Sequence, residues 1–584
     1  MTAIAGLVVA VLPGLVLTLA PVVFAAETTT DSGPLVSGPV TVYTAASVIT
    51  MEPALPRAEA VAVADGRIVG VGTVESLQPW VDRYGGRVDR SLAGKVIMPG
   101  FIDPHVHPSL PAVLTQFPFI APDDWTLPTG DFPGATTPEA YLSRLKDLVA
   151  QHHDPDVPFI TWGYHPLWHG EIYRDELNAL FPDEPVMLWH RSFHEVISND
   201  AALKLLGVSR ETLGEHDQID WARGHFFENG LVRLVPRMGF LFAPERYGQG
   251  MRNFIEMMHL GGVTTALDMG IGIFGDPVGE TALIRESAEA MQAPARLILT
   301  PIITDFLARG VSIPDAMAAI DEWRSHNSRR VLFDRRFKLM MDGAIYSGLA
   351  QIGFPGYLDG HHGIWMAPRE VTGAWARAFW KAGYQLHAHT NGDTSAAALI
   401  DLVRTLQREA PRTDHRTTLE HFAYSNEDQS RQMQALGMVV SANPYYHYIL
   451  SDIYADKWLG QERAGQMVRL GSLERLGVPF ALHSDCPMAP LQPLRLAAAA
   501  TNRVTINGNA TGQRERVSRD AALRAITIDA AWIIGWEDEI GSIRAGKRAD
   551  FTVLEADPYA VGAQGLADIG IWGTVFEGEP APIR

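Results

Sequence analysis

The sequence predicts an α/β fold: a (β/α)₈ barrel of the TIM type, a β-sandwich built from both ends of the chain, and a long insertion after the first barrel strand. Three observations indicate this arrangement. Eight apolar, strand-like runs alternate with helical stretches between residues 97 and 537, as parallel βα units do. Short runs with hairpin signals occur at both ends, in 39–96 and 538–584. Residues 108–252 interrupt the repeat and form the predicted insertion.

The two ends of the chain share a pattern of short alternating runs separated by turn signals. Alternating runs at 58–63 and 67–72 are separated by Asp65-Gly66, a dipeptide typical of tight hairpins. Near the C-terminus, 541–554 and 570–578 alternate in the same way between glycines. Two β-rich ends around a different middle predict one composite sandwich to which both ends contribute.

The predicted barrel strands end in polar residues. Their carboxyl ends should meet around one cavity, so these polar residues should face one another. Two more strand-like runs, 159–165 and 186–190, are assigned to the insertion, which lies at the same end of the barrel. The eight predicted barrel strands are 97–107, 264–269, 296–302, 337–342, 384–389, 417–421, 438–443 and 479–485.

The first barrel strand ends in two histidines separated by one residue, His105 and His107. Residues two apart on a strand point to the same face, so the two imidazoles should project together. Neutral imidazole is the commonest metal ligand. Alone, such a pair is equally compatible with a core or surface position.

Other strand ends supply the remaining candidates, His389, His421 and Asp485. With the first pair they predict a centre for zinc or a similar divalent ion. Lys338 lies in the fourth strand between bulky apolar neighbours. Burial would lower its pKa, and the neutral amine could take up carbon dioxide to give a carbamate that bridges two ions. The alternative interpretation is a surface lysine at the start of a strand.

Composition restricts the partners of the chain. The net charge of −19 argues against a nucleic-acid partner, while 47% hydrophobic and 20% charged residues are typical of a globular protein. Cys486 is the single cysteine, so no intramolecular disulfide forms. We interpret it as a packing residue, since no base partner is evident. The sequence leaves homo-oligomer formation open.

The N-terminal stretch 1–26 contains no charged side chain and is strongly apolar, with small residues near 23–25. These features predict a signal peptide and export to a bacterial periplasm or the medium. An uncleaved membrane anchor is the alternative, because the stretch is long enough to span a bilayer. Pro13 and Pro21 make a continuous spanning helix less favourable.

Six motifs in one order resemble the metal-dependent amidohydrolase superfamily, and more narrowly its YtcJ-like branch (amidohydrolase family 3), which includes N-substituted formamide deformylases. The resemblance runs from about residue 40 to the C-terminus. It implies a β-sandwich plus a distorted TIM barrel with one or two divalent ions, most often zinc. The motifs are Pro-Gly-Phe-Ile-Asp-Pro-His-Val-His at 99–107, Lys-x3-Asp-Gly at 338–343, His-x2-Gly-Asp at 389–393, Glu-His at 420–421, Ser-Asp at 484–485 and Gly-Ser-Ile-x2-Gly-Lys-x-Ala-Asp at 541–550.

Carried over position by position, the resemblance implies that His105 and His107 hold a first ion together with Asp485. His389 and His421 would hold a second ion, and carboxylated Lys338 would bridge the two. His387 lies two residues before His389, so on a strand both side chains point to the same face, and His387 is an alternative ligand. The Gly392-Asp393 pair that follows favours His389. His483 stands where a small residue is commoner in the family.

Three further residues receive roles from the resemblance. His194, in the insertion, would line the pocket and donate to the substrate carbonyl; an ordinary loop histidine is the alternative. Asp342 and Asp393 would orient the ligands, as outer partners of metal sites do. Either aspartate could instead hold a turn beside its neighbouring glycine.

The expected reaction is hydrolysis of a non-peptide carbon–nitrogen bond in a small molecule, such as an N-acyl or formamide group. Water activated by the metal would attack the carbonyl, and Asp485 would pass a proton to the leaving nitrogen. The bond class rests on analogy, because a barrel of this kind does not fix the substrate. Lactone or ester hydrolysis is one alternative. A binding or regulatory protein without turnover is another, against which the presence of all six candidate residues argues.

Overall fold

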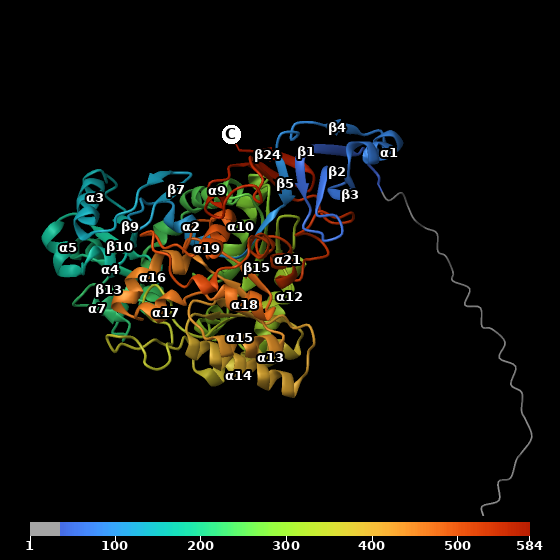
Figure 1. Cartoon of the computed structure of the whole chain (residues 1–584). Helices are drawn as coiled ribbons and strands as arrows, with labels where there is room; N and C mark the ends of the chain where they lie inside the picture. The colour runs from blue at the N-terminus through green and yellow to red at the C-terminus, as the bar shows by residue number, and fades with distance from the viewer. Residues whose placement is uncertain (1–35, 584) are drawn as a thin grey trace, which may run out of the picture.

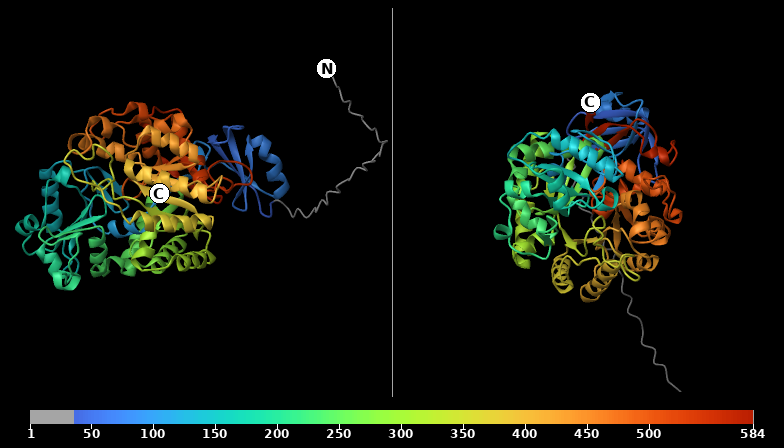
Figure 2. Two further views of the ribbon diagram at one scale, coloured as in Figure 1. Left: turned by 90° about the horizontal axis from the view of Figure 1, so that it is seen from below. Right: turned by 90° about the vertical axis from the view of Figure 1, so that its left-hand side faces the viewer.

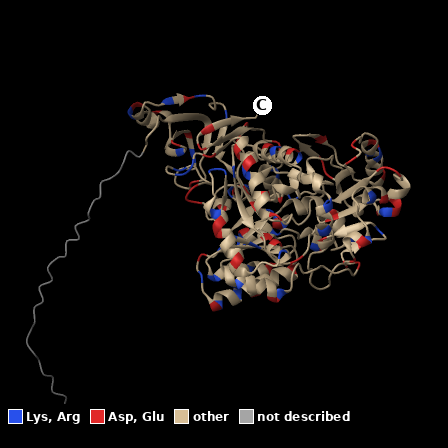
Figure 3. Cartoon of the chain, turned by 180° about the vertical axis from the view of Figure 1, so that it is seen from behind, with Lys and Arg blue, Asp and Glu red and all other residues tan. Residues whose placement is uncertain are grey.

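The computed structural model describes residues 36–583. The predicted signal peptide or anchor at 1–26 lies outside these residues. Among the helices that the structure describes, none combines the length and apolarity needed to cross a membrane. Acidic and basic residues are intermixed along the helices and strands in Figure 3.

Both ends of the chain contribute strands to one sheet at the edge of the molecule, where blue and red strands lie side by side (Figure 1). In it β22 pairs antiparallel with β5, with Phe551 opposite Pro99. Its division into two facing layers, as a sandwich requires, stays a prediction. Its order is β24-β23-β22-β5-β1-β2-β3, with β4 beside β1. The strands are β1 (Thr41–Ile49), β2 (Arg57–Ala64), β3 (Arg67–Gly72), β4 (Arg87–Asp89), β5 (Val96–Pro99), β22 (Phe551–Leu554), β23 (Ile571–Phe576) and β24 (Glu579–Pro582).

The predicted hairpin joins β2 and β3. Asp65 and Gly66 both have positive φ, 51° and 75°, as the tight turn of a twisted two-strand hairpin requires. Helix α1 (Val74–Tyr84) then packs on the sheet through Leu77, and a capping box between Thr73 and Ser76 begins it.

A parallel strand lies within each of the eight predicted barrel runs, the first of them only from Phe101, giving an α/β barrel-type fold. They form two arcs, β6-β14-β15, with β16 (Val331–Phe333) beside β15, and β17-β18-β19-β20-β21. Single bridges, Ile302 to Lys338 and Val106 to Cys486, join the arcs at their two seams, so no continuous closed ladder forms. The strands are β6 (Phe101–Val106), β14 (Val263–Ile271), β15 (Arg296–Pro301), β17 (Arg336–Met340), β18 (Gln385–Thr390), β19 (Thr418–His421), β20 (Val439–Ala442) and β21 (Phe480–Leu482).

Helices follow the barrel strands and cover the outside of both arcs (Figures 1 and 2). Helix α13, for example, presents an apolar face inward and buries Trp375, Phe379 and Trp380. These helices are α9 (Pro244–Leu260), α10 (Pro277–Ala290), α12 (Ile313–Ser325), α13 (Arg369–Lys381), α14 (Asp393–Glu409), α15 (Glu427–Leu436) and α18 (Leu470–Leu476).

The prediction of one barrel strand over 97–107 is wrong. Residues Val96–Pro99 are β5 of the terminal sheet, and the barrel strand β6 begins at Phe101. The break falls at Gly100, where a Cβ atom would lie 2.1 Å from Thr264 Oγ1. The close approach of β14 therefore requires glycine at the point where the chain passes from one sheet to the other.

The insertion builds a five-stranded sheet of its own, the cyan and green module of Figures 1 and 2. The two strand-like runs assigned to it are parallel neighbours, β9 (Phe159–Tyr164) and β10 (Val186–His190). The other strands are β11 (Glu195–Ser198), β12 (Ile219–Asp220) and β13 (His225–Phe227). Helices α3 (Pro138–Ala150) and α5 (Arg174–Leu180) cover one face and share a core with it.

Candidate active site

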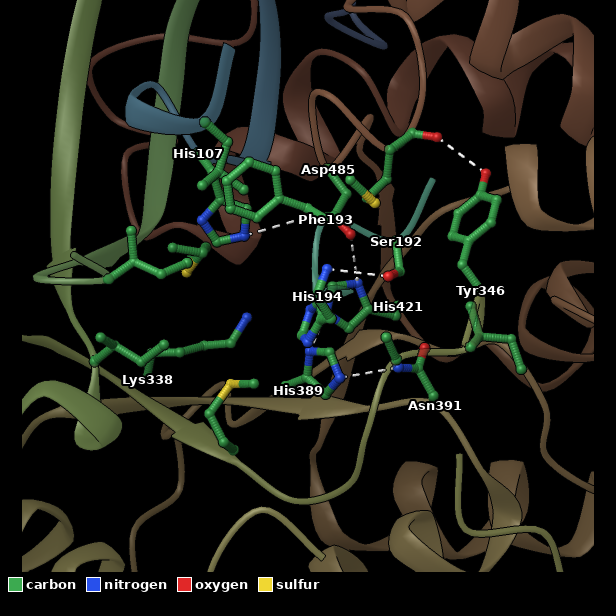
Figure 4. Close-up of a pocket in the computed structure, with 18 of the residues that line it drawn as sticks. His107, Ser192, Phe193, His194, Lys338, Tyr346, His389, Asn391, His421 and Asp485 are labelled. Carbon is green, nitrogen blue, oxygen red and sulfur yellow. Dashed lines mark hydrogen bonds and ion pairs between the residues drawn. The ribbon is translucent and has the colours of Figure 1, made fainter. Parts of the chain in front are cut away.

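The candidate residues converge at the carboxyl ends of the barrel strands, around a cavity of about 80 Å³ (Figure 4). His105 lies in β6 and His107 directly after it, while Asp485 follows β21. His389 and His421 lie in β18 and β19. The structure thus brings the strand-end residues together from positions 380 apart in the sequence.

Asp485 lies among three imidazoles. Its carboxylate is 3.3 Å from His107 Nε2, 3.5 Å from His105 Nε2 and 3.5 Å from His421 Nδ1. The Tyr446 hydroxyl donates to the same carboxylate at 2.9 Å. Burial alone would raise the pKa of Asp485, but the hydrogen bond from His107 and the surrounding basic side chains, Lys338 among them, outweigh it and the pKa is lowered. Asp485 is therefore held as an ionised carboxylate facing the cavity.

His389 and His421 form the second part of the cluster. His389 Nδ1 and His421 Nε2 lie 2.8 Å apart, and the Asn391 side-chain amide lies 2.9 Å from His389 Nε2. Burial lowers the pKa of both histidines well below the ordinary value. Both rings are therefore neutral at physiological pH, the form in which imidazole binds metal.

Lys338 lies inside β17 and is buried (1% exposed). Its Nζ is 3.3 Å from His105 Nε2. Burial lowers its pKa from 10.5 to about 8, the direction that its apolar neighbours in the sequence predict. Part of the lysine population is then neutral near physiological pH and able to react as an amine.

Glu420 lies beneath the cluster and is fully buried. Its two oxygens contact His105 Nδ1 at 2.7 Å and His387 Nδ1 at 2.6 Å, while His483 Nδ1 is 3.6 Å away. Burial raises the pKa of Glu420 to about 7. Glu420 belongs to the Glu-His motif at 420–421, but the sequence predicts no role for it.

A model of the "Amidohydrolase family" matches residues 90–582. The chain belongs to the amidohydrolase family. It is accordingly an enzyme, a hydrolase of carbon–nitrogen bonds, and the family implies a divalent metal.

Relatives cover almost the whole chain. An N-substituted formamide deformylase of Arthrobacter pascens is 26% identical over 564 residues, which are 91% of this chain and 96% of that protein. The putative amidohydrolase YtcJ of Bacillus subtilis is 24% identical over 549 residues, 90% and 96% of the two chains. An uncharacterized metal-dependent hydrolase from Pyrococcus horikoshii shares the fold, with TM-score 0.69, 20% identity and coverage of 90% and 99%.

The amidohydrolase offers donors that suit a divalent cation. In the described part of the chain, two groups have ligand atoms within 4.8 Å of one another: His105 with His107 and Asp485, and His105 with His421 and His483. Buried nitrogens without hydrogen-bond partners among residues 36–583 include His107 Nδ1 and His483 Nε2. Imidazoles with free nitrogens next to one carboxylate are a donor set typical of zinc.

His194 lines the cavity, as the resemblance implies. Its Nδ1 is 2.9 Å from Glu228 Oε2. Burial opposes the charged form of this imidazole, but Glu228 outweighs it and the pKa of His194 is raised. A hydrogen bond at Nδ1 leaves Nε2 as the nitrogen available to a substrate.

Asp342 and Asp393 hold backbone turns. The Asp342 carboxylate accepts from the backbone N–H groups of Asn391, Gly392 and Gln351, each at 2.9 Å. Asp393 accepts from Gly353 N–H at 2.7 Å. Asp342 thus affects His389 only through the loop that follows His389. The contacts of both aspartates are those expected of residues that hold a turn.

Two further buried carboxylates, Asp268 of β14 and Glu280 of α10, have no role in the sequence prediction. Asp268 Oδ1 is 3.9 Å from His107 Nδ1, and burial raises the pKa of Asp268 well above its ordinary value. Glu280 accepts from Gly272 N–H at 2.7 Å. In the sequence, Asp268 is a single charged residue inside the apolar run of β14. That interruption is the one sequence feature that singles out this aspartate.

Arg191 joins the insertion to the loop that carries Asp485. Its guanidinium is buried, pairs with Asp123 at 3.3 Å, and donates to the Met488 carbonyl at 3.0 Å. The rings of Trp162 and Tyr346 lie 4.5 and 4.8 Å from it. Because Tyr346 and Met488 also line the cavity, Arg191 fixes one wall of the site.

Proposed function

We propose that this amidohydrolase removes a short acyl group, formyl above all, from the nitrogen of a small-molecule amide by hydrolysis. One observation carries the proposal. An ionised carboxylate, Asp485, lies among three imidazoles at the edge of a small cavity with mainly apolar walls. Such a site can hold a cation, accept a proton from water and exclude bulk solvent from the bond that breaks.

One or two divalent ions, zinc in first place, belong to the proposal. His105, His107 and Asp485 would hold one, and His389 and His421 another, with a carbamate on Lys338 between them. A bound cation would lower the pKa of water and polarise the substrate carbonyl. The neutral form of Lys338 that its lowered pKa makes available supports the carbamate.

Two side chains would move or supply protons. Asp485 would take the proton of the attacking water and deliver it to the nitrogen as the carbon–nitrogen bond breaks, so the products are the carboxylic acid and the amine. His194, oriented by Glu228, would donate from Nε2 to the carbonyl oxygen, where negative charge develops.

The size of the cavity supports a small acyl group. About 80 Å³ is well below the roughly 300–1,000 Å³ of pockets for drug-sized ligands. Met269, Ile302, Met340 and Ile345 supply apolar walls, which a formyl or acetyl group would contact without leaving polar groups unpaired. The relative named N-substituted formamide deformylase points to the same bond class.

A substrate series tests the proposal. Metal-replete enzyme is offered the N-formyl, N-acetyl and N-butanoyl derivatives of one amine, with lactones as a second panel. We expect kcat/KM to fall along the amide series and to vanish after chelation. Turnover of lactones without turnover of any amide would favour the ester-hydrolase alternative. Tight binding without turnover of either panel would favour a non-catalytic binding protein.

A further inference from the structure

Glu420 is a fully buried carboxylate that the proposed reaction does not use. It lies in β19, one residue before His421, and is 0% exposed. Its Oε2 is 2.7 Å from Nδ1 of His105, a residue of β6. Its Oε1 is 2.6 Å from Nδ1 of His387, a residue of β18. Burying a carboxylate costs free energy unless hydrogen bonds compensate it, so its place between two imidazoles requires a physical explanation.

The two histidines at the end of the first barrel strand differ in what holds their rings. Nδ1 of His105 is bound to Glu420. The buried Nδ1 of His107, in contrast, has no hydrogen-bond partner within residues 36–583. The His105 side chain is also fully buried, whereas that of His107 is 14% exposed. The orientation of the His105 ring therefore depends on Glu420, and His107 has no corresponding support.

Two contacts agree on which nitrogen of His105 carries the proton. Lys338 Nζ is 3.3 Å from Nε2, and a lysine ammonium group only donates, so Nε2 is the accepting nitrogen. Imidazole binds a metal in its neutral form, which has one N–H, and here that N–H is at Nδ1. Glu420 Oε2 therefore accepts from Nδ1–H. The assignment holds for either charge of Glu420, because a protonated carboxyl group keeps an accepting oxygen.

We propose that Glu420 is a positioning residue that holds His105 with Nε2 directed at the first metal ion. This ion is the one assigned above to His105, His107 and Asp485. A carboxylate at the opposite nitrogen fixes the ring and the tautomer of a ligating histidine and makes it a stronger ligand. Glu420 does not line the cavity, so it acts through His105. The inference rests on the metal dependence of the proposed function and not on its substrate.

A matched pair of variants separates this role from a purely structural one. Glu420→Gln keeps the volume of the side chain and replaces the carboxyl group by an amide. A neutral amide is a weaker acceptor than a carboxylate and can also present its NH₂ group to the ring. His387→Phe removes the other hydrogen bond of Glu420 and leaves the bond to His105 in place. His387 belongs to neither group of candidate ligands, so only a structural role of Glu420 would make the two variants alike.

The measurement is the Zn²⁺ affinity of the full chain, by competition with a chromophoric chelator, with a melting curve for each variant. We expect Glu420→Gln to bind Zn²⁺ about 10–100-fold more weakly than wild type, and His387→Phe to stay within about threefold. The absorption of the Co²⁺-loaded enzyme should change in Glu420→Gln alone. Wild-type affinity in Glu420→Gln, or equal losses in both variants, would overturn the proposal. Zinc binding by wild type without amide turnover would contradict the substrate proposal alone.

A crystal structure of the zinc-loaded wild-type enzyme gives a second test, which does not depend on the folding of any variant. We expect the ion at Nε2 of His105 and the Glu420 carboxyl group within hydrogen-bond distance of Nδ1. An ion at Nδ1, or a Glu420 side chain turned away from the ring, would overturn the proposal.

Discussion

Asp485 and His421 both adopt left-handed backbone conformations, with φ of 54° and 76°. Such conformations cost a non-glycine residue of the order of 1–3 kcal/mol and persist only where the surroundings impose them. Here the backbone N–H of Asp485 donates to the His105 carbonyl at 2.9 Å. The strained residues bring their side chains into the cavity, where the carboxylate meets the imidazoles.

Replacing Asp485 by Asn keeps its shape and removes its charge. We expect kcat to fall by about 10²–10⁴, the usual contribution of a general base, because an amide cannot accept the proton of water. The measurement is single-turnover hydrolysis of an N-formyl amine by metal-loaded protein, with a melting curve to show that the variant is folded. A variant within fivefold of the wild-type rate would contradict the role.

The structure brings together the strand-end side chains that the sequence singles out, and their roles as ligands and proton carriers stay predictions. The contacts of Glu420 with this cluster were not predictable in the same way. Neighbouring residues on a strand point to opposite faces, so with His421 facing the site Glu420 is expected to face away. The positive φ of His421 breaks that alternation, so both side chains reach the centre. A backbone conformation of this kind has no signature in residue types.

The pair of imidazoles around Glu195 predicts a pH-dependent stability. Glu195 Oε2 is 2.7 Å from His225 Nε2, and Oε1 is 3.6 Å from His190 Nδ1. Burial raises the pKa of Glu195, but His190 and His225 outweigh it and the pKa is lowered below 4.5. A glutamate whose pKa is lowered by folding stabilises the folded protein at pH values above its pKa in the unfolded chain. This stabilisation is lost progressively as the pH falls below that unfolded-state pKa.

Glu195→Gln should therefore destabilise the protein at pH 7, by about 1.5–3 kcal/mol for a hydrogen bond to a charged group. The difference from wild type should shrink as pH falls from 5 towards 3. Denaturant unfolding across this range measures it. A difference that is the same at pH 7 and pH 3 would show that the carboxylate charge is not its source.

At the scale of elements, the passage from β5 to β6 depends on a glycine. Gly100→Ala would place a Cβ atom 2.1 Å from Thr264 Oγ1, so β6 and β14 must separate or Thr264 must move. We expect a loss of stability of about 1–3 kcal/mol, as for other overpacked sites. Gly94→Ala is the matched control, since its Cβ meets nothing within 4 Å. Equal melting temperatures for the two variants would contradict this account.

The sequence predicts that a strand is present more reliably than it predicts where that strand begins and ends. The apolar run of 97–107 is broken by Pro99-Gly100 but resumes at Phe101, so hydrophobicity alone could not show that the chain changes sheets there. The eight barrel runs were found because each is apolar and ends in a polar residue. Their arrangement in two arcs joined by single bridges depends on strand register at the seams, which residue types do not encode.

At the scale of the whole molecule, Arg296 joins the barrel to the terminal sheet. It begins β15, is buried, and pairs with Asp550 at 2.5 Å and Glu577 at 3.0 Å. Arg296→Met leaves Asp550 without its buried partner, which typically costs about 3–5 kcal/mol. Denaturant unfolding measures the loss.

The exposed pair of Arg210 and Glu215 is the control for that experiment. Arg210→Ala should change stability by about 1 kcal/mol at most, because water and salt screen exposed ion pairs. Were both arginine variants to lose the same amount, the ion pairs of Arg296 would not be what couples barrel and sheet.

The account as a whole depends on a divalent cation held by the histidine cluster. The most direct test follows hydrolysis of an N-formyl amine by chelator-treated enzyme as Zn²⁺ is added back, with bound metal counted per chain. The account predicts negligible turnover without metal and recovery that saturates at one or two equivalents. Undiminished turnover by metal-free protein would contradict it.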